Sequence, residues 1–237
     1  MSLLHTIKQS IPNSITCLNL LSGCLACIFA FSAYSHYGAL DGWQWACVCI
    51  GAACVFDFLD GFMARLLKAY SKIGAELDSL SDLVSFGVAP AFLMFNIMTA
   101  RYEADIQWVA YFALLGPVFG ALRLARFNVM DVGTTTFRGL PIPSNAIFLV
   151  GVAGLCNDYA MLNPIVMIAL ITLSALAMVG RFEMFSLKFT HYGLTGNFRR
   201  YVILLTAAAF VVMYGLAGLA WTIVFYFLLS VLSRRKV

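Results

Sequence analysis

Long apolar runs recur along the whole chain, and this pattern limits the possible folds more than any other feature of the sequence. A run of about 20 apolar residues is long enough to cross a bilayer as a helix. Of the 237 residues, 62% are hydrophobic and only 11% are charged, whereas a soluble domain carries roughly 25% charged residues. The sequence therefore predicts an integral membrane protein without a sizeable water-soluble domain.

The apolar runs predict an all-α, polytopic transmembrane bundle of about eight spans. The loops between the runs are short, so we expect residues 1–237 to form one integral membrane domain. Its catalytic core is expected over about residues 11–181, and residues 182–237 are expected to form a cytoplasmic loop and the last two spans. The predicted spans lie near residues 14–34, 43–66, 79–100, 107–127, 141–158, 162–181, 200–215 and 217–233.

The placement of lysine and arginine predicts the orientation, because cytoplasmic loops accumulate positive charge. With eight spans, Arg101 alone falls on the side of the membrane opposite to the other basic residues. Both termini are therefore predicted to be cytoplasmic, in the inner (cytoplasmic) membrane. The net charge of +4 is explained by topology and contact with anionic lipid. No basic stripe with interleaved aromatic residues indicates nucleic-acid binding.

Two features near the N-terminus have alternative interpretations. Apolar residues recur at helical spacing over residues 3–11, which fits either a short interfacial helix or a disordered tail before the first span. Cys24 and Cys27 form a C-x-x-C pattern. Because neither a second pair nor a nearby histidine accompanies them inside an apolar run, we interpret the cysteines as packing residues.

Aspartates gather around the second and third predicted spans. The chain has eleven acidic residues, and five of them lie within residues 57–82. Asp57 and Asp60 are three residues apart, and Asp78 and Asp82 are four apart, so each pair lies on one face of its helix. Because the connection between the two helices is short, they are expected to be antiparallel neighbours. The four carboxylates should then converge near the cytoplasmic side.

Converging carboxylates in a membrane helix need compensation, since one aspartate at the centre of a span costs about 2.5–3.5 kcal/mol. Oxygen ligands select magnesium, manganese or calcium, and pairs of such ions are used in displacement at phosphorus. The alternative is a structural salt-bridge network with Arg65, Lys68 and Lys72. We favour the metal site because small residues, which let a ligand approach the backbone closely, are interleaved with the acids. These small residues are Gly61, Ala64 and Gly74.

Residues 57–82 read D-x2-D-G-x2-A-R-x8-G-x3-D-x3-D, which resembles the full signature of the CDP-alcohol phosphotransferase family at every position. Further segments resemble the phosphatidylserine synthase branch of this family, so that the resemblance covers roughly residues 11–146. These segments are IPNSIT from Ile11, LDSLSDLVSFGVAP from Leu77, RLARFN from Arg123 and GLPIPSNA from Gly139.

The resemblance implies transfer of a phosphatidyl group from CDP-diacylglycerol to the hydroxyl of L-serine, with release of CMP. In the family's manner, Asp57, Asp60 and Asp78 would hold one pair of Mg²⁺ or Mn²⁺ ions and the diphosphate. Asp82 would complete the metal cluster and act as the catalytic base. The resemblance also implies a homodimer. The residues expected to bind the CDP group are Asn13, Thr16, Asp60, Gly61, Ala64, Arg65, Gly74 and Asp78.

Several of these assignments have alternatives. Asn13 and Thr16 could instead cap a helix that begins after Pro12, and Arg65 could be a topology anchor. The serine carboxylate needs a cation, and the planar fork of arginine suits it. Arg138 is the first candidate, Arg126 the second and Arg123 the third, although the last two could pair with the aspartates or with lipid phosphate.

Two other functions are compatible with parts of the pattern. The same family has members with other acceptors, such as glycerol 3-phosphate or inositol phosphate, whose phosphate demands a more basic pocket. An ion-coupled transporter also uses carboxylates within the membrane, but transporters commonly have inverted repeats with broken helices in both halves. Here the acids occupy one pair of helices without a counterpart later in the chain, which favours an enzyme.

Overall fold

The computed structural model describes residues 3–129, 139–182, 184 and 197–232, and these residues are almost entirely helical. The chain divides into two compact units, residues 1–124 and 125–237. The prediction of an all-α fold is confirmed. Arg138, the first candidate for the serine carboxylate, lies outside the described residues, as does most of the segment before α8 (Phe198–Tyr214).

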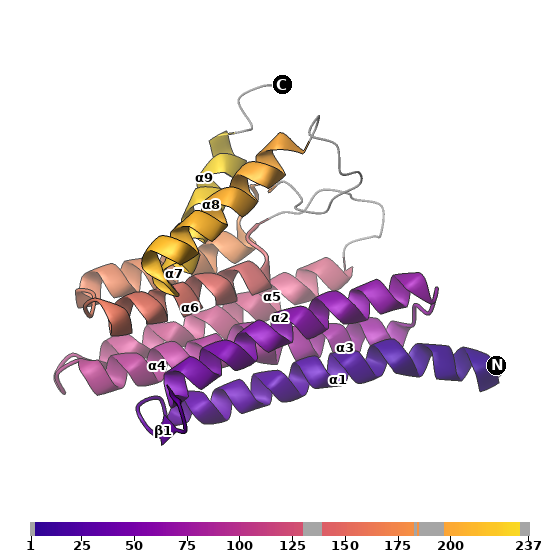
Figure 1. The fold of residues 1–237 in the computed structure, drawn as a ribbon, viewed down its shortest axis with the longest axis horizontal. Helices are drawn as coiled ribbons and strands as arrows, with labels where there is room; N and C mark the ends of the chain where they lie inside the picture. The colour runs from indigo at the N-terminus through magenta and orange to yellow at the C-terminus, as the bar shows by residue number, and fades with distance from the viewer. Residues whose placement is uncertain (1–2, 130–138, 183, 185–196, 233–237) are drawn as a thin grey trace. The chain divides into compact units, whose positions relative to one another are not determined.

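The first unit is built around a pair of long helices, α1 (Leu3–Phe31) and α2 (Gly42–Leu66), which lie side by side (Figure 1). Buried alanines on both helices, among them Ala26 and Ala53, allow the backbones to approach closely. A small hairpin joins them, with strands β1 (His36–Tyr37) and β2 (Leu40–Asp41) in antiparallel register. The ring nitrogen Nδ1 of His36 pairs with Oδ1 of Asp41 at 2.5 Å across this hairpin.

A third long apolar segment follows as one continuous run of helix, α3 (Lys72–Asp82), the π-helical turn η1 (Leu83–Val88) and α4 (Ala89–Arg101). Both α3 and η1 pack against α1. The unit continues through η2 (Gln107–Leu114), which packs on α4, into α5 (Leu115–Val129). Its core contains large buried side chains from several of these helices, including Ile50, Phe86, Leu93, Met94 and Ile97.

The second unit contains α6 (Ile142–Asp158), α7 (Pro164–Val179), α8 and α9 (Ala217–Leu232). α6 packs closely on α9, because Gly151 and Gly154 have no side chain at the contact. A Cβ added at Gly151 would lie 2.2 Å from the backbone nitrogen of Ala220. Gly215, with a φ of +58°, ends α8 and allows the tight turn into α9.

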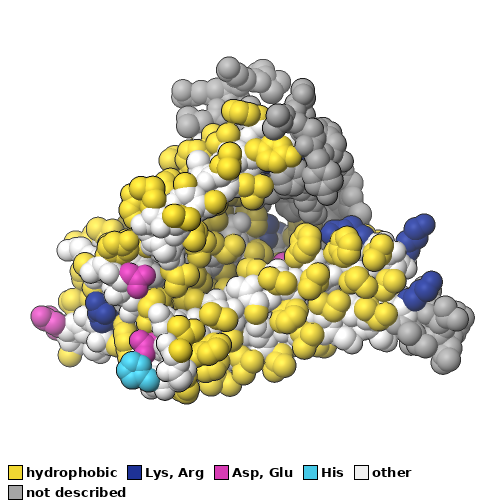
Figure 2. Space-filling model, viewed as in Figure 1, with side chains coloured by type: hydrophobic (Ala, Val, Ile, Leu, Met, Phe, Trp, Pro, Cys, Tyr) yellow, Lys and Arg dark blue, Asp and Glu magenta, His cyan; other side chains and the backbone are white. Residues whose placement is uncertain are grey.

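Four helical segments of the described chain are long and apolar enough to cross a membrane: Lys8–Phe31, Gly42–Leu66, Lys72–Arg101 and Gln107–Val129. They contain the first four predicted spans, except that α1 ends at Phe31 rather than near residue 34. The last four predicted spans correspond to α6, α7, α8 and α9, which are shorter. In Figure 2, hydrophobic side chains cover the middle of α1 and α2, and charged side chains gather toward the helix ends.

The structure changes the interpretation of the N-terminal segment. α1 begins at Leu3 and continues without a break through the first apolar run, with Pro12 inside it. The segment before the first span is therefore neither a separate interfacial helix nor a tail. Proline removes one backbone donor from a helix interior, and the hydroxyl of Thr16 donates to the carbonyl of Pro12 at 3.0 Å.

Candidate functional site

The aspartate cluster is formed where α2 ends and α3 begins. Residues 67–71 connect the two helices, and the connection is tightened by hydrogen bonds from Leu67 N to Met63 O and from Ala69 N to Ala64 O. Ser71 then caps α3, because its side chain accepts a hydrogen bond from the backbone nitrogen of Gly74 at 2.9 Å. This short, fixed turn brings the two aspartate pairs of the signature together, as the sequence predicts.

Three of the four aspartates form a group suited to a metal ion. Asp57, Asp60 and Asp78 each offer one carboxylate oxygen, and the three oxygens lie within 4.8 Å of one another. Asp60 is buried, with 5% of its surface exposed. Oxygens at this separation can converge on one hard cation such as magnesium or manganese. For magnesium, ligand distances are about 2.0–2.1 Å.

Asp60 and Asp78 each have one buried oxygen without a hydrogen-bond partner within the described chain. Oδ2 of Asp60 and Oδ1 of Asp78 are buried and accept no hydrogen bond there. A buried charged oxygen without a partner costs free energy, and a divalent cation removes that cost. These oxygens are therefore a direct structural sign that the donor set fits a metal.

For Asp60 and Asp78, the described residues give the salt-bridge alternative no support. Arg65 and Lys68 are exposed. Among the described residues, no ion pair links Arg65, Lys68 or Lys72 to the buried carboxylate of Asp60 or to Asp78. The positive charge that balances these carboxylates is accordingly not supplied by the basic residues of the α2–α3 connection.

Asp82 belongs to the same site but is held differently. It lies one turn beyond Asp78 on α3, and the charges of Asp57, Asp60 and Asp78 act on its carboxylate. The side-chain nitrogen Nδ2 of Asn19, from α1, donates to Oδ1 of Asp82 at 3.3 Å. The fourth aspartate thus has a hydrogen-bond donor from a different helix, and it stands outside the three-oxygen group.

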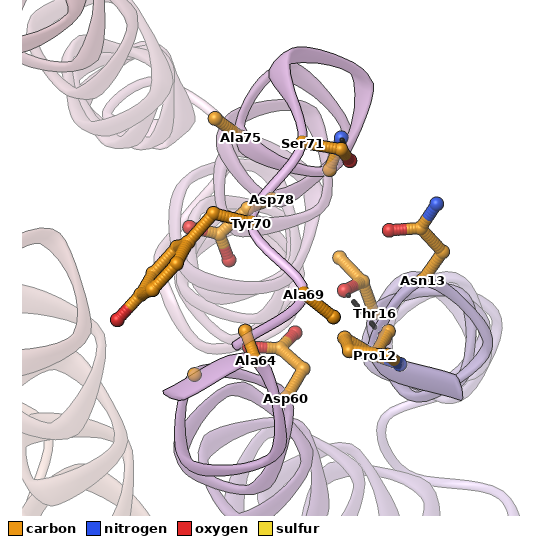
Figure 3. A pocket seen from close by; sticks show the side chains of 12 residues that line it. Pro12, Asn13, Thr16, Asp60, Ala64, Ala69, Tyr70, Ser71, Ala75 and Asp78 are labelled. Carbon is orange, nitrogen blue, oxygen red and sulfur yellow. Dashed lines mark hydrogen bonds between the residues drawn. The ribbon is translucent and has the colours of Figure 1, made fainter. Parts of the chain in front are cut away.

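A cleft of about 230 Å³ opens beside Asp60 and Asp78, between α1, α2 and the start of α3 (Figure 3). In the view of Figure 3, Asp60 and Asp78 flank the centre of the cleft, and Asn13 and Thr16 face them from α1. The lining residues are Pro12, Asn13, Thr16, Asp60, Gly61, Ala64, Ala69, Tyr70, Ser71, Gly74, Ala75 and Asp78.

The cleft brings together seven of the eight residues predicted to bind the CDP group, and Arg65 is the exception. The two signature glycines contribute in different ways. A Cβ on Gly61 would meet nothing closer than Nη1 of Arg65 at 3.9 Å, so the absence of a side chain there leaves the cleft open. A Cβ on Gly74 would lie 2.9 Å from both Oδ1 of Asn13 and Oγ of Ser71, so glycine permits close packing of α3 on α1.

The capping interpretation of Asn13 and Thr16 is wrong. Both residues lie inside α1, well after its first turn. The hydroxyl of Thr16 donates to a carbonyl one turn earlier, and Thr16 also contacts the Asp60 carboxylate. The two side chains are available to the cleft because α1 extends past Pro12 and faces α2 and α3.

The sequence analysis missed Asn19 and the part of the cleft formed by the α2–α3 connection, chiefly Ala69, Tyr70 and Ser71. Asn19 had a recognisable signal, since it lies three residues after Thr16 and therefore on the same face of α1. The connection had none, because no motif or spacing in a short loop indicates that its residues line a cleft.

The predicted arginines differ in their surroundings. Arg123 lies on α5 and is partly buried; its Nε is buried and has no partner in the described chain. The charge of Asp82 acts on its guanidinium. Arg126, one turn later, is exposed. Of the two described arginines, Arg123 is the one associated with the aspartate cluster.

Comparison with known proteins identifies the family. Residues 9–180 match the model of the CDP-alcohol phosphatidyltransferase family. The chain belongs to this family. The family that the signature resembles is thereby confirmed. The four aspartates of the signature lie in helical segments long enough to cross a membrane. The chain is an all-α integral membrane protein.

The names of individual relatives specify a reaction as well as the family. The chain is 39% identical over 160 residues to a CDP-diacylglycerol–serine O-phosphatidyltransferase of Methanocaldococcus jannaschii, covering 67% of each chain. It is 38% identical over 154 residues to an enzyme of the same name from Mycobacterium leprae, covering 62% of this chain and 47% of that one. An archaetidylserine synthase of Methanothermobacter thermautotrophicus is 37% identical over 143 residues, 55% of its length. The chain thus spans only about half the length of the last two relatives.

We expect the aspartate cluster of this family member to bind a divalent metal in the purified protein. Manganese should raise the unfolding temperature in detergent, because a ligand that binds the native state stabilises it. Asp78→Asn should abolish this rise, since a neutral amide is a poorer ligand for a hard cation. The measurements are thermal unfolding and manganese binding by electron paramagnetic resonance.

Glu76→Gln is the matched control, because Glu76 is an exposed acid on the same helix, two residues from Asp78. It should leave both manganese binding and the metal-dependent rise intact. If Asp78→Asn binds manganese as tightly as the unchanged protein does, the metal assignment of the cluster is wrong.

Proposed function

We propose that the protein transfers a phosphatidyl group from CDP-diacylglycerol to the hydroxyl of L-serine, giving phosphatidylserine and CMP in a metal-dependent reaction. The observation that carries this proposal is the pair of buried, unpartnered oxygens on Asp60 and Asp78 at the wall of the cleft. The family and the names of the relatives from Methanocaldococcus jannaschii and Mycobacterium leprae supply the substrate class.

Asp57, Asp60 and Asp78 are the proposed metal ligands, with Asp82 completing the set around one pair of Mg²⁺ or Mn²⁺ ions. When bound, such ions stabilise negative charge on phosphate oxygens and on a leaving phosphate. The proposal is supported by the separation of the three oxygens and by the oxygens of Asp60 and Asp78 that have no hydrogen-bond donor within the described chain.

The cleft is the proposed site of the CDP group. Gly61 and Ala64 line it on α2 and leave room for a flat ring against the helix backbone, and Gly74 does so on α3. Asn13 and Thr16 offer polar contacts from α1. Arg65 is exposed near the mouth, where its guanidinium can reach a phosphate oxygen.

The proposed reaction is a direct displacement. The hydroxyl oxygen of serine attacks the phosphorus of the phosphatidyl group, the bond from that phosphorus to the CMP oxygen breaks, and CMP leaves with the bonding electrons. Asp82 takes the proton of the attacking hydroxyl. A positioned base of this kind contributes about 10²–10⁴-fold, and no covalent enzyme intermediate is required.

The carboxylate of serine needs a cationic partner beside Asp82, and Arg123 is the described arginine that fits. Its buried Nε has no partner within the described residues, and its guanidinium lies within the electrostatic reach of Asp82. Arg126 is exposed and remains a second candidate. Arg138 stays a prediction from the sequence alone.

We also propose the membrane arrangement that this reaction needs. The protein lies in the inner membrane with eight spans, both termini and the aspartate site facing the cytoplasm, where serine and CMP are soluble. The family match over residues 9–180 supports a catalytic core of about residues 11–181. A homodimer stays a prediction; a monomeric mass by light scattering would contradict it.

One experiment separates the proposed reaction from its alternatives. Purified protein is incubated with CDP-diacylglycerol, manganese or magnesium, and one acceptor at a time from a panel of serine, glycerol 3-phosphate and inositol phosphate. We expect CMP release with serine only, complete loss with a chelator, and recovery on adding the metal back. CMP release with a phosphorylated acceptor but not with serine would show that the protein is a family member with that other acceptor. No CMP release with any acceptor would overturn the proposed function.

The role of Arg123 has a kinetic test in the same assay. Arg123→Ala should raise KM for serine about tenfold to a hundredfold, because removing a partner from a partly desolvated carboxylate costs about 1.5–3 kcal/mol, while KM for CDP-diacylglycerol changes little. Arg101→Ala, at the end of α4, is the control and should change neither constant. If Arg123→Ala leaves KM for serine unchanged and Arg138→Ala raises it, the serine carboxylate binds at Arg138.

The proposed orientation is tested with thiols introduced at the two ends of α2. Lys72 and Ala39 are both exposed; Lys72 begins α3 just after the connection that follows α2, and Ala39 lies in the hairpin that precedes α2. In a background with Cys17 and Cys24 replaced, a membrane-impermeant reagent should label Ala39→Cys in intact cells. It should label Lys72→Cys only after the membrane is opened. The reverse pattern would place the aspartates on the outer side.

A further inference from the structure

The hydrogen bond between α1 and Asp82 is not used by the reaction as proposed above. Asn19 is fully buried, with 0% of its surface exposed, and its Nδ2 donates to Oδ1 of Asp82 at 3.3 Å. An ionised carboxylate can only accept hydrogen bonds, so the amide nitrogen, rather than the amide oxygen, must face it. The two residues are 63 positions apart in the chain.

Asn19 is held in place by a series of contacts between α1 and the helix that carries Asp82. The hydroxyl of Ser85 donates to the carbonyl of Asn19 at 3.0 Å, and one turn earlier the hydroxyl of Ser81 donates to the carbonyl of Thr16 at 3.3 Å. One turn later, a Cβ added at Gly23 would lie 2.4 Å from Oγ of Ser85. The backbone of α1 is thus fixed against α3 and η1 on both sides of Asn19.

Stability alone does not explain an asparagine at this position. The other amide atom, Oδ1 of Asn19, is buried and has no hydrogen-bond partner in the described chain. A buried acceptor without a partner costs free energy, and an apolar side chain of the same shape would avoid that cost. The feature that an apolar side chain lacks is the donor to Asp82.

We infer that Asn19 is a positioning residue for the reaction. Its amide holds the Asp82 carboxylate by Oδ1 and thereby fixes the direction of Oδ2, which takes the proton of the attacking hydroxyl. This inference rests on the proposed function, in which Asp82 is the base. Because a donor of this kind is charge-assisted, its loss should matter more than the loss of a neutral hydrogen bond.

Asn19→Leu is the central test, because leucine has a similar size and no donor. In the assay of CMP release with serine, kcat should fall about tenfold to a hundredfold, whereas KM for CDP-diacylglycerol should stay within about twofold. The unfolding temperature should change little, because leucine removes the unpartnered oxygen of Asn19 and also removes the donor to Asp82. Asn19→Asp should lower kcat further, because it places a carboxylate against the Asp82 carboxylate.

Coupling to Asp82 distinguishes positioning from a general structural role. If Asn19 acts through Asp82, the double variant Asn19→Leu with Asp82→Asn should have the same residual activity as Asp82→Asn alone, measured with radiolabelled serine over long incubation. Manganese binding by electron paramagnetic resonance should be equal in Asn19→Leu and the unchanged protein.

Ser22→Ala is the matched control. Ser22 lies one turn after Asn19 on α1 and is buried, but its hydroxyl donates to the carbonyl of Cys49 at 2.8 Å and not to the site. Its replacement should lower the unfolding temperature and leave kcat unchanged. The control thus separates a lost contact of α1 from a lost contact to Asp82.

The outcomes that overturn the inference differ from the one that overturns the proposed function. If the unchanged protein releases no CMP, the proposed function fails. If the unchanged protein is active and Asn19→Leu keeps its kcat, or if its effect adds to that of Asp82→Asn, Asn19 does not position the base. Loss of manganese binding in Asn19→Leu would show that Asn19 supports the metal cluster instead.

Discussion

Carboxylates inside apolar helices must be compensated, and the arrangement of the first unit depends on this requirement. Asp60 is nearly inaccessible to solvent, and the described chain offers no donor to its Oδ2 or to Oδ1 of Asp78. An uncompensated charge at membrane depth costs several kcal/mol. In the proposed function a bound cation supplies this compensation, which accounts for a fold that brings acidic oxygens together rather than separating them.

The sequence predicted the parts of this arrangement that follow from local geometry. Spacings of three and four residues place Asp57 with Asp60 and Asp78 with Asp82 on single helix faces, and a short connection forces α2 and α3 to be antiparallel. The apolar runs correctly predicted where helices occur, since a helix in lipid satisfies its own backbone hydrogen bonds. These inferences use only sequence patterns within residues 42–101, where the interacting residues are close together in the chain.

The contribution of α1 could not be predicted in the same way, because it depends on pairing between residues far apart in the chain. The bonds from Ser81 to Thr16 and from Ser85 to Asn19 join residues 65 and 66 positions apart. No periodic pattern marks such a pair in a single sequence. The continuation of α1 through Pro12 was missed for a related reason: proline usually ends or kinks a helix, and here the packing of α1 against α2 and α3 outweighs that preference.

The four aspartates of the signature are alike in the sequence, but their surroundings make them chemically different. Asp60 and Asp78 present oxygens that lack any donor in the described chain, which suits a cation, and Asp57 completes their group of three. Asp82 accepts a hydrogen bond from the Asn19 amide on α1. A metal ligand needs free lone pairs, whereas a base needs a fixed direction and one oxygen left for the proton. In the proposed reaction Asp82 completes the metal set and also takes the proton, and the feature that distinguishes it from Asp60 and Asp78 is the amide donor from α1, the helix that carries no acidic residue of the signature.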